Sequence, residues 1–102
     1  MRIFSKPVLV RFLVGHREAT GAVMRWYREA SAAVWESHHD VKAYSASVSV
    51  IDAERVVFNV GGNKYRLVAA LVYHRQWVFI KFIGTHRQYD AVDVATVEPE
   101  LP

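Results

Sequence analysis

Three side chains that can transfer protons lie close together near the C-terminus: His86, Tyr89 and Asp90. His86 is the most natural acid or base, because an imidazole gains and loses a proton near neutral pH. Tyr89 could stack on a nucleobase or relay a proton, and Asp90 could orient His86 or act as the base itself. Upstream, Arg66 could hold a phosphate through a bidentate fork, and Lys81 could do so as a point charge.

Cleavage of an RNA strand needs all of these functions. A base must take the proton of the 2′-hydroxyl, cations must stabilise the pentavalent phosphorane, and an acid must protonate the leaving 5′-oxygen. No metal or cofactor is required. The residue types predict a catalytic set of Arg66, Lys81, His86, Tyr89 and Asp90, with RNA binding by Arg55, Asn59, Lys64, Arg75 and Arg87. The alternative is structural, since such residues also pack, cap or simply face water.

The charge distribution supports a polyanionic partner. The 102 residues include 13 Lys and Arg and 10 Asp and Glu, for a net charge of +3. The last thirteen residues hold Asp90, Asp93, Glu98 and Glu100, which leaves residues 1–89 with 13 basic and only 6 acidic side chains. A basic surplus of this size favours docking on RNA or the ribosome, although a solvated surface would have the same composition.

Length and composition predict one domain spanning residues 1–102. With 52% hydrophobic residues the chain can bury one core, and it has no cysteine, so neither disulfides nor thiolate metal sites are available. The adjacent His38 and His39 would diverge, so no metal site is expected. Because no segment approaches the roughly 18 to 20 apolar residues that span a bilayer, and no signal peptide is visible, we expect a cytoplasmic protein without membrane contact.

The first half of the sequence predicts a strand and two helices. The strand covers residues 2–4, and a helix follows from Ser5 or Lys6 to Gly15 with Pro7 in its first turn. Thr20 could cap a second helix, whose apolar positions recur every three or four residues at Val23, Trp26, Tyr27, Ala30, Ala33 and Val34. Asp40 could cap a short helical turn through Tyr44, and alternation predicts a brief strand at 48–50.

The second half predicts an antiparallel meander. Two β-rich runs, 55–60 and 64–73, flank Gly-Gly-Asn, whose residues accept the positive φ of a tight hairpin turn. A second turn at 74–76 leads into a strand over 77–83, and residues 85–90 form a closing loop or short helix. The predicted fold is therefore α+β, with an N-terminal strand and two helices packed on a small antiparallel sheet.

The strand register decides whether the basic residues meet. A turn at Gly62 and Asn63 makes one face of the hairpin continuously apolar by pairing Val60 with Tyr65, Phe58 with Leu67 and Val56 with Ala69. A four-residue second turn then pairs Leu67 with Phe82, Ala69 with Ile80 and Leu71 with Val78. In this register Lys81 shares an open face with Arg66, whereas a three-residue turn would bury Lys81 unpaired.

Three stretches resemble the HigB family of type II toxins: Val56–Leu67 (VVFNVGGNKYRL), Val78–His86 (VFIKFIGTH) and Tyr89–Asp90. The opening Met-Arg-Ile and the Trp26-Tyr27 pair are similar too, so the likeness covers nearly the whole chain. It implies a RelE-like fold and ribosome-dependent cleavage of translated mRNA. It also implies neutralisation by a HigA-type antitoxin, whose helix-turn-helix domain would carry the complex to operator DNA.

The resemblance transfers the site only in part. RelE-like nucleases vary in which side chain acts as the base. The resemblance therefore identifies Arg66 and Lys81 only as cations on the central strands, and residues 86, 89 and 90 only as polar groups near the C-terminus. The related ParE group uses the same fold to poison DNA gyrase without cutting RNA. A non-catalytic binding module, such as a gyrase inhibitor or a ribosome-binding stress factor, is therefore the alternative.

Overall fold

The computed structural model describes residues 1–100, which form one five-stranded sheet in the order β1-β5-β4-β3-β2. The strands are β1 (Arg2–Phe4), β2 (Ser49–Val50), β3 (Arg55–Val60), β4 (Tyr65–Val72) and β5 (Trp77–Thr85). β1 runs parallel to β5, and the other neighbours are antiparallel. The N-terminal strand thus closes one edge of the meander.

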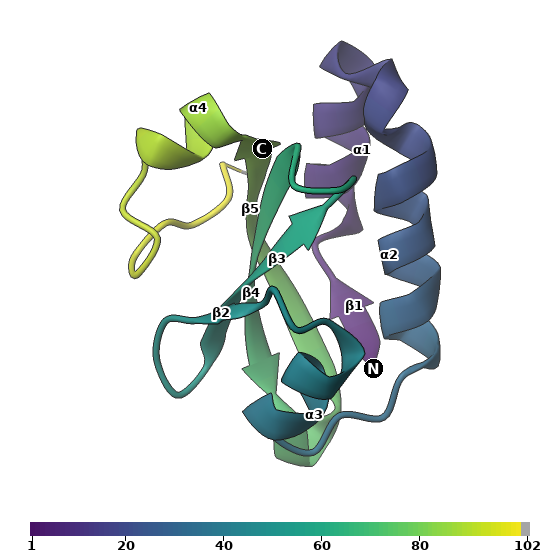
Figure 1. Ribbon diagram of the computed structural model, residues 1–102, viewed down its shortest axis with the longest axis vertical. Helices are drawn as coiled ribbons and strands as arrows, with labels where there is room; N and C mark the ends of the chain where they lie inside the picture. The colour runs from purple at the N-terminus through teal and green to yellow at the C-terminus, as the bar shows by residue number, and fades with distance from the viewer. Residues whose placement is uncertain (101–102) are drawn as a thin grey trace.

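The helices are α1 (Lys6–Gly15), α2 (Thr20–Ala32), α3 (His38–Tyr44) and α4 (His86–Asp90), with short 3₁₀ turns η1 (Arg17–Ala19) and η2 (Tyr73–Arg75). Figure 1 shows α1 and α2 on one side of the sheet, with α4 and the chain that follows it on the other. The predicted α+β class is confirmed, and of the two alternatives expected for residues 85–90, a closing loop or a short helix, α4 is the short helix. In residues 1–100 no helix is long and apolar enough to cross a membrane.

The core lies between the sheet and the helices. Its largest fully buried side chains include Phe58, Leu9, Leu67, Leu71 and Ile80. The rings of Trp26 and Trp35 lie 5.3 and 5.8 Å from that of Phe58, measured between centroids. Burial of these apolar and aromatic side chains provides the main stabilisation of the fold.

The start and end of α2 differ from the prediction. Thr20 is the first helical residue rather than the cap, because η1 precedes it and its hydroxyl donates to the Arg17 carbonyl over 2.8 Å. The helix ends at Ala32, since Ala33 is extended with ψ 152°. Val34 therefore leaves the predicted apolar stripe and is 72% exposed.

The start of α3 also differs from the prediction. Its N-cap position is Ser37, and Asp40 lies inside the first turn. The Asp40 carboxylate accepts from the Glu36 amide over 2.8 Å. Asp40 therefore holds the residues just before α3 through the Glu36 amide, and it does not cap the helix.

The hairpin register is confirmed for β3 and β4 and is shifted in part of β5. Ala69 pairs with Ile80 and Leu71 with Val78 as predicted, but Leu67 pairs with Ile83 rather than Phe82. The reason is a β-bulge between Val68 and Ala69, which places one extra residue on β5. The bulge allows both Ile80 and Ile83 to reach the core, which strict alternation would forbid.

The face of the sheet opposite α1 and α2 is not fully open. Val57, Val68 and Ala70 alternate away from the helices, yet they are only 2%, 0% and 7% exposed. Residues 91–100, which we call the C-terminal segment, lie on this side of the sheet (Figure 1). The segment is tied down through Arg55, so it covers part of the face that the sequence predicts to be open.

Candidate active site

Arg66 lies on β4 and pairs with Gly84, near the C-terminal end of β5. Its guanidinium carbon lies 5.7 Å from the ring centroid of Tyr89 on α4. Its Nε atom is buried and makes no hydrogen bond within residues 1–100. A buried donor of a charged group without a partner is costly, so an anion close to this guanidinium would offset part of that cost.

Gly84 brings α4 close to Arg66. A Cβ atom at Gly84 would lie 2.6 Å from the Phe82 ring and 2.9 Å from Oε1 of Gln88. Thr85 then begins α4 with a capping box, in which its hydroxyl accepts from the Gln88 amide and the Gln88 side chain accepts from the Thr85 amide. This box fixes the first turn of the short helix that carries His86 and Tyr89.

His86 is held by the β3–β4 hairpin turn. Its Nε2 atom is hydrogen-bonded to the carbonyl oxygen of Asn63, which has a left-handed φ of 81°. A carbonyl only accepts, so Nε2 carries the proton and Nδ1 of the neutral ring is free to accept one. The basic atom of the neutral ring is therefore Nδ1.

Asp90 does not orient His86 in this structure. Within residues 1–100 its carboxylate makes no hydrogen bond or ion pair with the imidazole, and the side chain is exposed. The Asn63 carbonyl orients the imidazole instead, by accepting a hydrogen bond from Nε2. Sequence reasoning treated Asn63 only as a turn residue, and no pattern in the sequence indicated this contact between residues 63 and 86.

A second cluster forms around Glu98 in the C-terminal segment. Lys81 Nζ lies 2.8 Å from Glu98 Oε2, and Arg55 Nη2 lies 2.9 Å from Glu98 Oε1. The hydrogen bond from Lys81, together with the charges of both cations, lowers the pKa of Glu98 below its ordinary value. Lys81 is 21% exposed at its side chain. Sequence reasoning missed Glu98, although its position in an acidic tail after a basic body was a usable signal.

Arg55 anchors the C-terminal segment. It is only 9% exposed, and its Nη1 donates to the carbonyls of Val94 and Val97 over 3.1 and 2.7 Å. These bonds and the one to Glu98 occupy the guanidinium. An RNA contact through Arg55 would require the segment to move, and it stays a prediction.

The remaining predicted RNA contacts are dispersed. Asn59 donates to the Ser47 carbonyl over 3.3 Å at the outer edge of β3, and Lys64 is exposed in the hairpin turn. Arg87 is exposed on α4. Arg75 lies at the opposite end of β5 from α4, over the ring of Trp77. The structure therefore places Arg66 beside Tyr89 on α4, the helix that begins with His86, and joins Arg55 and Lys81 through Glu98. Within residues 1–100 no hydrogen bond or ion pair links Arg66, His86 or Tyr89 to the Glu98 cluster.

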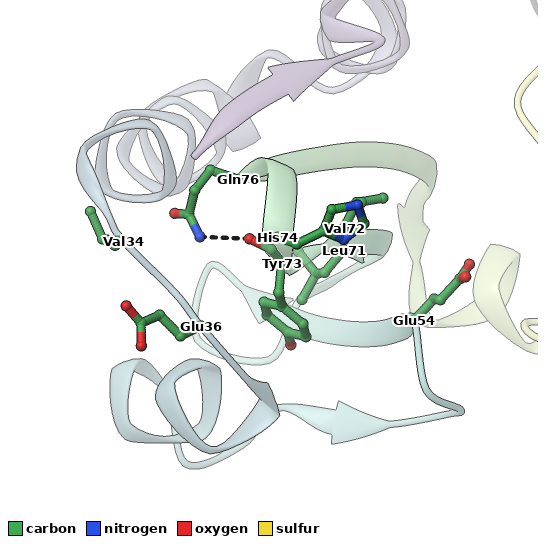
Figure 2. A pocket seen from close by; sticks show the side chains of 8 residues that line it. All are labelled: Val34, Glu36, Glu54, Leu71, Val72, Tyr73, His74 and Gln76. Carbon is green, nitrogen blue, oxygen red and sulfur yellow. Dashed lines mark hydrogen bonds between the residues drawn. The ribbon is translucent and has the colours of Figure 1, made fainter.

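A hollow of about 700 Å³ lies at the far end of the sheet from α4. Figure 2 shows its lining, in which Gln76 donates to the Tyr73 carbonyl over 3.0 Å. Its charged side chains are Glu36 and Glu54, and it includes no Lys or Arg. An acidic lining repels phosphate, so this hollow is a poor site for RNA. A groove of about 440 Å³ beside Lys81 and the C-terminal segment is lined by Arg11 and Lys81 but also by Glu98 and Glu100.

The α+β fold, with α1 and α2 packed on one side of a five-stranded sheet (Figure 1), is consistent with a RelE-like toxin. The family model for HigB toxin, described as the RelE-like toxic component of a toxin-antitoxin system, matches residues 19–92. The chain therefore belongs to the HigB toxin family.

Curated relatives agree over a shorter stretch. The chain is 47% identical over 34 residues to the mRNA interferase toxin HigB of Escherichia coli (strain K12), and equally so to the mRNA interferase HigB of Shigella flexneri. Each match covers 33% of this chain and 33% of the relative. The chain thus aligns with about a third of the length of these relatives.

Proposed function

We propose that this chain is an mRNA interferase, an endoribonuclease that cleaves translated mRNA on the ribosome without a metal. The observation that carries the proposal is Arg66, a half-buried guanidinium whose Nε has no partner within residues 1–100, beside Tyr89 of α4, the helix that begins with His86. This arrangement offers a phosphate a cation next to a proton-transfer group. The relatives named as mRNA interferases support it.

The proposed reaction uses the ribose as the nucleophile. Nδ1 of His86 takes the proton of the 2′-hydroxyl, and the 2′-oxygen attacks the adjacent phosphorus. The bond to the 5′-oxygen breaks, and the Tyr89 hydroxyl protonates that oxygen as it leaves, giving a 2′,3′-cyclic phosphate and a 5′-hydroxyl; the phenolate then regains a proton from water. Arg66 stabilises the charge on the phosphorane, and Lys81 adds to it once Glu98 is displaced.

The proposed partners follow from the same surface. A basic face suits the ribosome and its mRNA, and such a toxin acts in the cytoplasm. A HigA-type antitoxin with a helix-turn-helix domain would silence it, either by covering the face with acidic residues or by keeping it out of the ribosome. The complex would reach operator DNA only through that antitoxin.

Cleavage by translating ribosomes tests the proposal. Purified wild-type protein should cut mRNA in the presence of enough EDTA to remove transition metals, with ribosomal Mg²⁺ maintained. Arg66→Ala should lower the cleavage rate by roughly 100-fold or more, the scale expected when a group that stabilises transition-state charge is removed. Arg28→Ala, on the exposed side of α2, is the matched control for loss of a positive charge.

The non-catalytic alternative makes a different prediction. A gyrase inhibitor or a ribosome-binding stress factor would arrest growth without cutting mRNA, and gyrase inhibition would change DNA supercoiling. Growth arrest by the wild type with intact mRNA would contradict the nuclease proposal. The names of the matched relatives do not favour this alternative.

A further inference from the structure

A row of cation–aromatic pairs runs along the sheet face opposite α1 and α2. The guanidinium of Arg2 lies 4.9 Å from the ring centroid of Phe4 on β1. On β5, Arg75 lies 5.1 Å from the Trp77 ring and Lys81 lies 5.7 Å from the Phe79 ring. We propose that Phe4, Trp77 and Phe79 form a stacking platform for the bases of single-stranded RNA, with these cations holding its phosphates.

The strand register places all three rings on the same face. Arg2 pairs with Trp77 and Phe4 pairs with Phe79 in the parallel β1–β5 ladder. Ile3 and Val78, which alternate with them, pack into the helix-side core. The rings therefore point away from α1 and α2, and each is half-buried, which leaves part of each ring available to a ligand.

The three rings form one contiguous surface. Phe4 stacks on Phe79 with centroids 4.9 Å apart and planes 15° apart. Trp77 meets both rings edge-on, at 5.5 Å from Phe4 and 6.1 Å from Phe79. Trp26 and Trp35, by contrast, are 4% exposed in the core. The Trp77 ring is thus the one indole in the described residues that is not fully buried.

Charge favours RNA over a protein as the occupant. Each ring of the platform lies beside a cation. Within residues 1–100 only one of these three cations, Lys81, also forms an ion pair, at 2.8 Å from Glu98. Proteins bind single strands without sequence preference by this combination of aromatic faces for bases and cations for the backbone. A protein partner would need acidic residues matched to these three cations, whereas every RNA segment supplies phosphates.

The platform extends the site of the proposed function, on which it rests for the identity of its ligand. Lys81 is the cation of the Phe79 pair and also the cation bound by Glu98. The Arg66–Tyr89 pair continues the same kind of contact at the α4 end. An RNA strand on the platform would therefore lead toward Arg66.

Binding of an uncleavable RNA tests the platform. The probe is a labelled 12-nucleotide 2′-O-methyl RNA, which lacks the free 2′-hydroxyl, and the readout is fluorescence anisotropy at fixed salt. Trp77→Leu and Phe79→Leu keep apolar volume but remove the aromatic face. Each should weaken binding by roughly five- to 150-fold, the loss expected for one base–aromatic stack. Val10→Ala, on exposed α1 surface, is the control.

Tryptophan fluorescence distinguishes direct stacking on Trp77 from a loss of binding caused by a disturbed fold. Wild-type tryptophan emission should fall on titration with the same RNA, because a base stacks on Trp77, and this quenching should be absent in Trp77→Leu. Unchanged affinity in both Leu variants would overturn the platform. The platform would also be overturned if the Leu variants bound RNA as tightly as the wild type but bound the antitoxin more weakly, because this face would then be a protein interface.

The binding result separates the platform from the proposed function. Because the probe cannot be cleaved, it reports on the rings whether or not the protein is a nuclease. Weakened RNA binding in the Leu variants supports the platform even if wild-type protein leaves mRNA intact, a result that would contradict only the nuclease proposal.

Discussion

Lys81 lies 2.8 Å from Glu98, so the cation that the sequence assigns to an RNA phosphate is paired with a carboxylate of the chain's own C-terminal segment. The same carboxylate lies 2.9 Å from Arg55. Carboxylate and phosphate oxygens are bound by the same donors. An RNA that uses Lys81 must therefore displace Glu98.

Replacing Glu98 should strengthen RNA binding. Glu98→Gln removes the charge that competes with phosphate at Lys81, and we expect a roughly 1.5- to five-fold gain in affinity for the 2′-O-methyl RNA, since an exposed ion pair contributes about 0.2–1 kcal/mol. Glu100→Gln is the matched control. Glu100 lies two residues from Glu98, and its carboxylate makes no ion pair within residues 1–100. Equal affinities for the two variants would contradict competition at Lys81.

Acid should loosen the C-terminal segment through Glu98. Its pKa is lowered in the folded protein, chiefly by the hydrogen bond from Lys81. The stabilisation is therefore present above the unfolded-state pKa and is lost as the pH falls through the folded-state value. The protection factors of the amide hydrogens in the segment, which correct for the slower intrinsic exchange in acid, should fall on acidification below about pH 4.5 in the wild type. In Glu98→Gln these protection factors should already be lowered at neutral pH.

His86 should be required for cleavage. His86→Gln removes the basic Nδ1 atom and should lower the rate on translating ribosomes by roughly 100- to 10,000-fold, the usual contribution of a general acid or base. Binding of the uncleavable RNA should change little. His39→Gln is the control, because His39 is exposed on α3. Cleavage by His86→Gln at the wild-type rate would assign proton transfer elsewhere.

Phe58 should be critical for stability. Its ring is 1% exposed and lies near the rings of Trp26, Trp35 and Tyr44. Phe58→Ala should lower the free energy of unfolding by about 3–5 kcal/mol, through lost burial and the cavity left behind. Urea denaturation monitored by circular dichroism measures this loss. Val10→Ala, at a side chain that is 53% exposed, should change stability by less than about 0.5 kcal/mol.

Tyr73 should make the fold sensitive to alkali. Burial, with a smaller effect from the Asp40 charge, raises the pKa of Tyr73 to about 12 from its ordinary value of 10.0. Between these values the unfolded chain loses the phenolic proton while the folded protein keeps it, so stability falls as the pH rises.

Tyr73→Phe should make that decline shallower in urea unfolding measured from pH 9 to 12. Tyr27→Phe is the control, because the Tyr27 hydroxyl makes no hydrogen bond within residues 1–100. The variant also removes the contact between the Tyr73 hydroxyl and His38 Nδ1, so its stability at neutral pH provides the baseline. An unchanged slope in Tyr73→Phe would contradict the assignment to this phenol.

Local patterns in the sequence determined the elements and most of the register. The turn residues 61–63 set the β3–β4 hairpin, and alternation of apolar residues set which face of β3 and β4 meets the helices. These predictions hold because tight-turn geometry and the two-residue period of a strand are local properties. The candidate residue Arg66 could be proposed for the same reason, from its type and the face expected for its strand, and Tyr89 from its type and its place just after the last strand.

Only the tertiary structure decided what those residues contact. The β5 bulge, the hydrogen bond from His86 to the Asn63 carbonyl, and the pairing of Glu98 with Arg55 and Lys81 all join parts of the chain far apart in sequence. Each arises from packing against the whole core, since the bulge lets Ile83 be buried and the C-terminal segment covers the second face of the sheet. Periodicity fixes the direction of a side chain, whereas its partner depends on which distant segment the fold brings beside it.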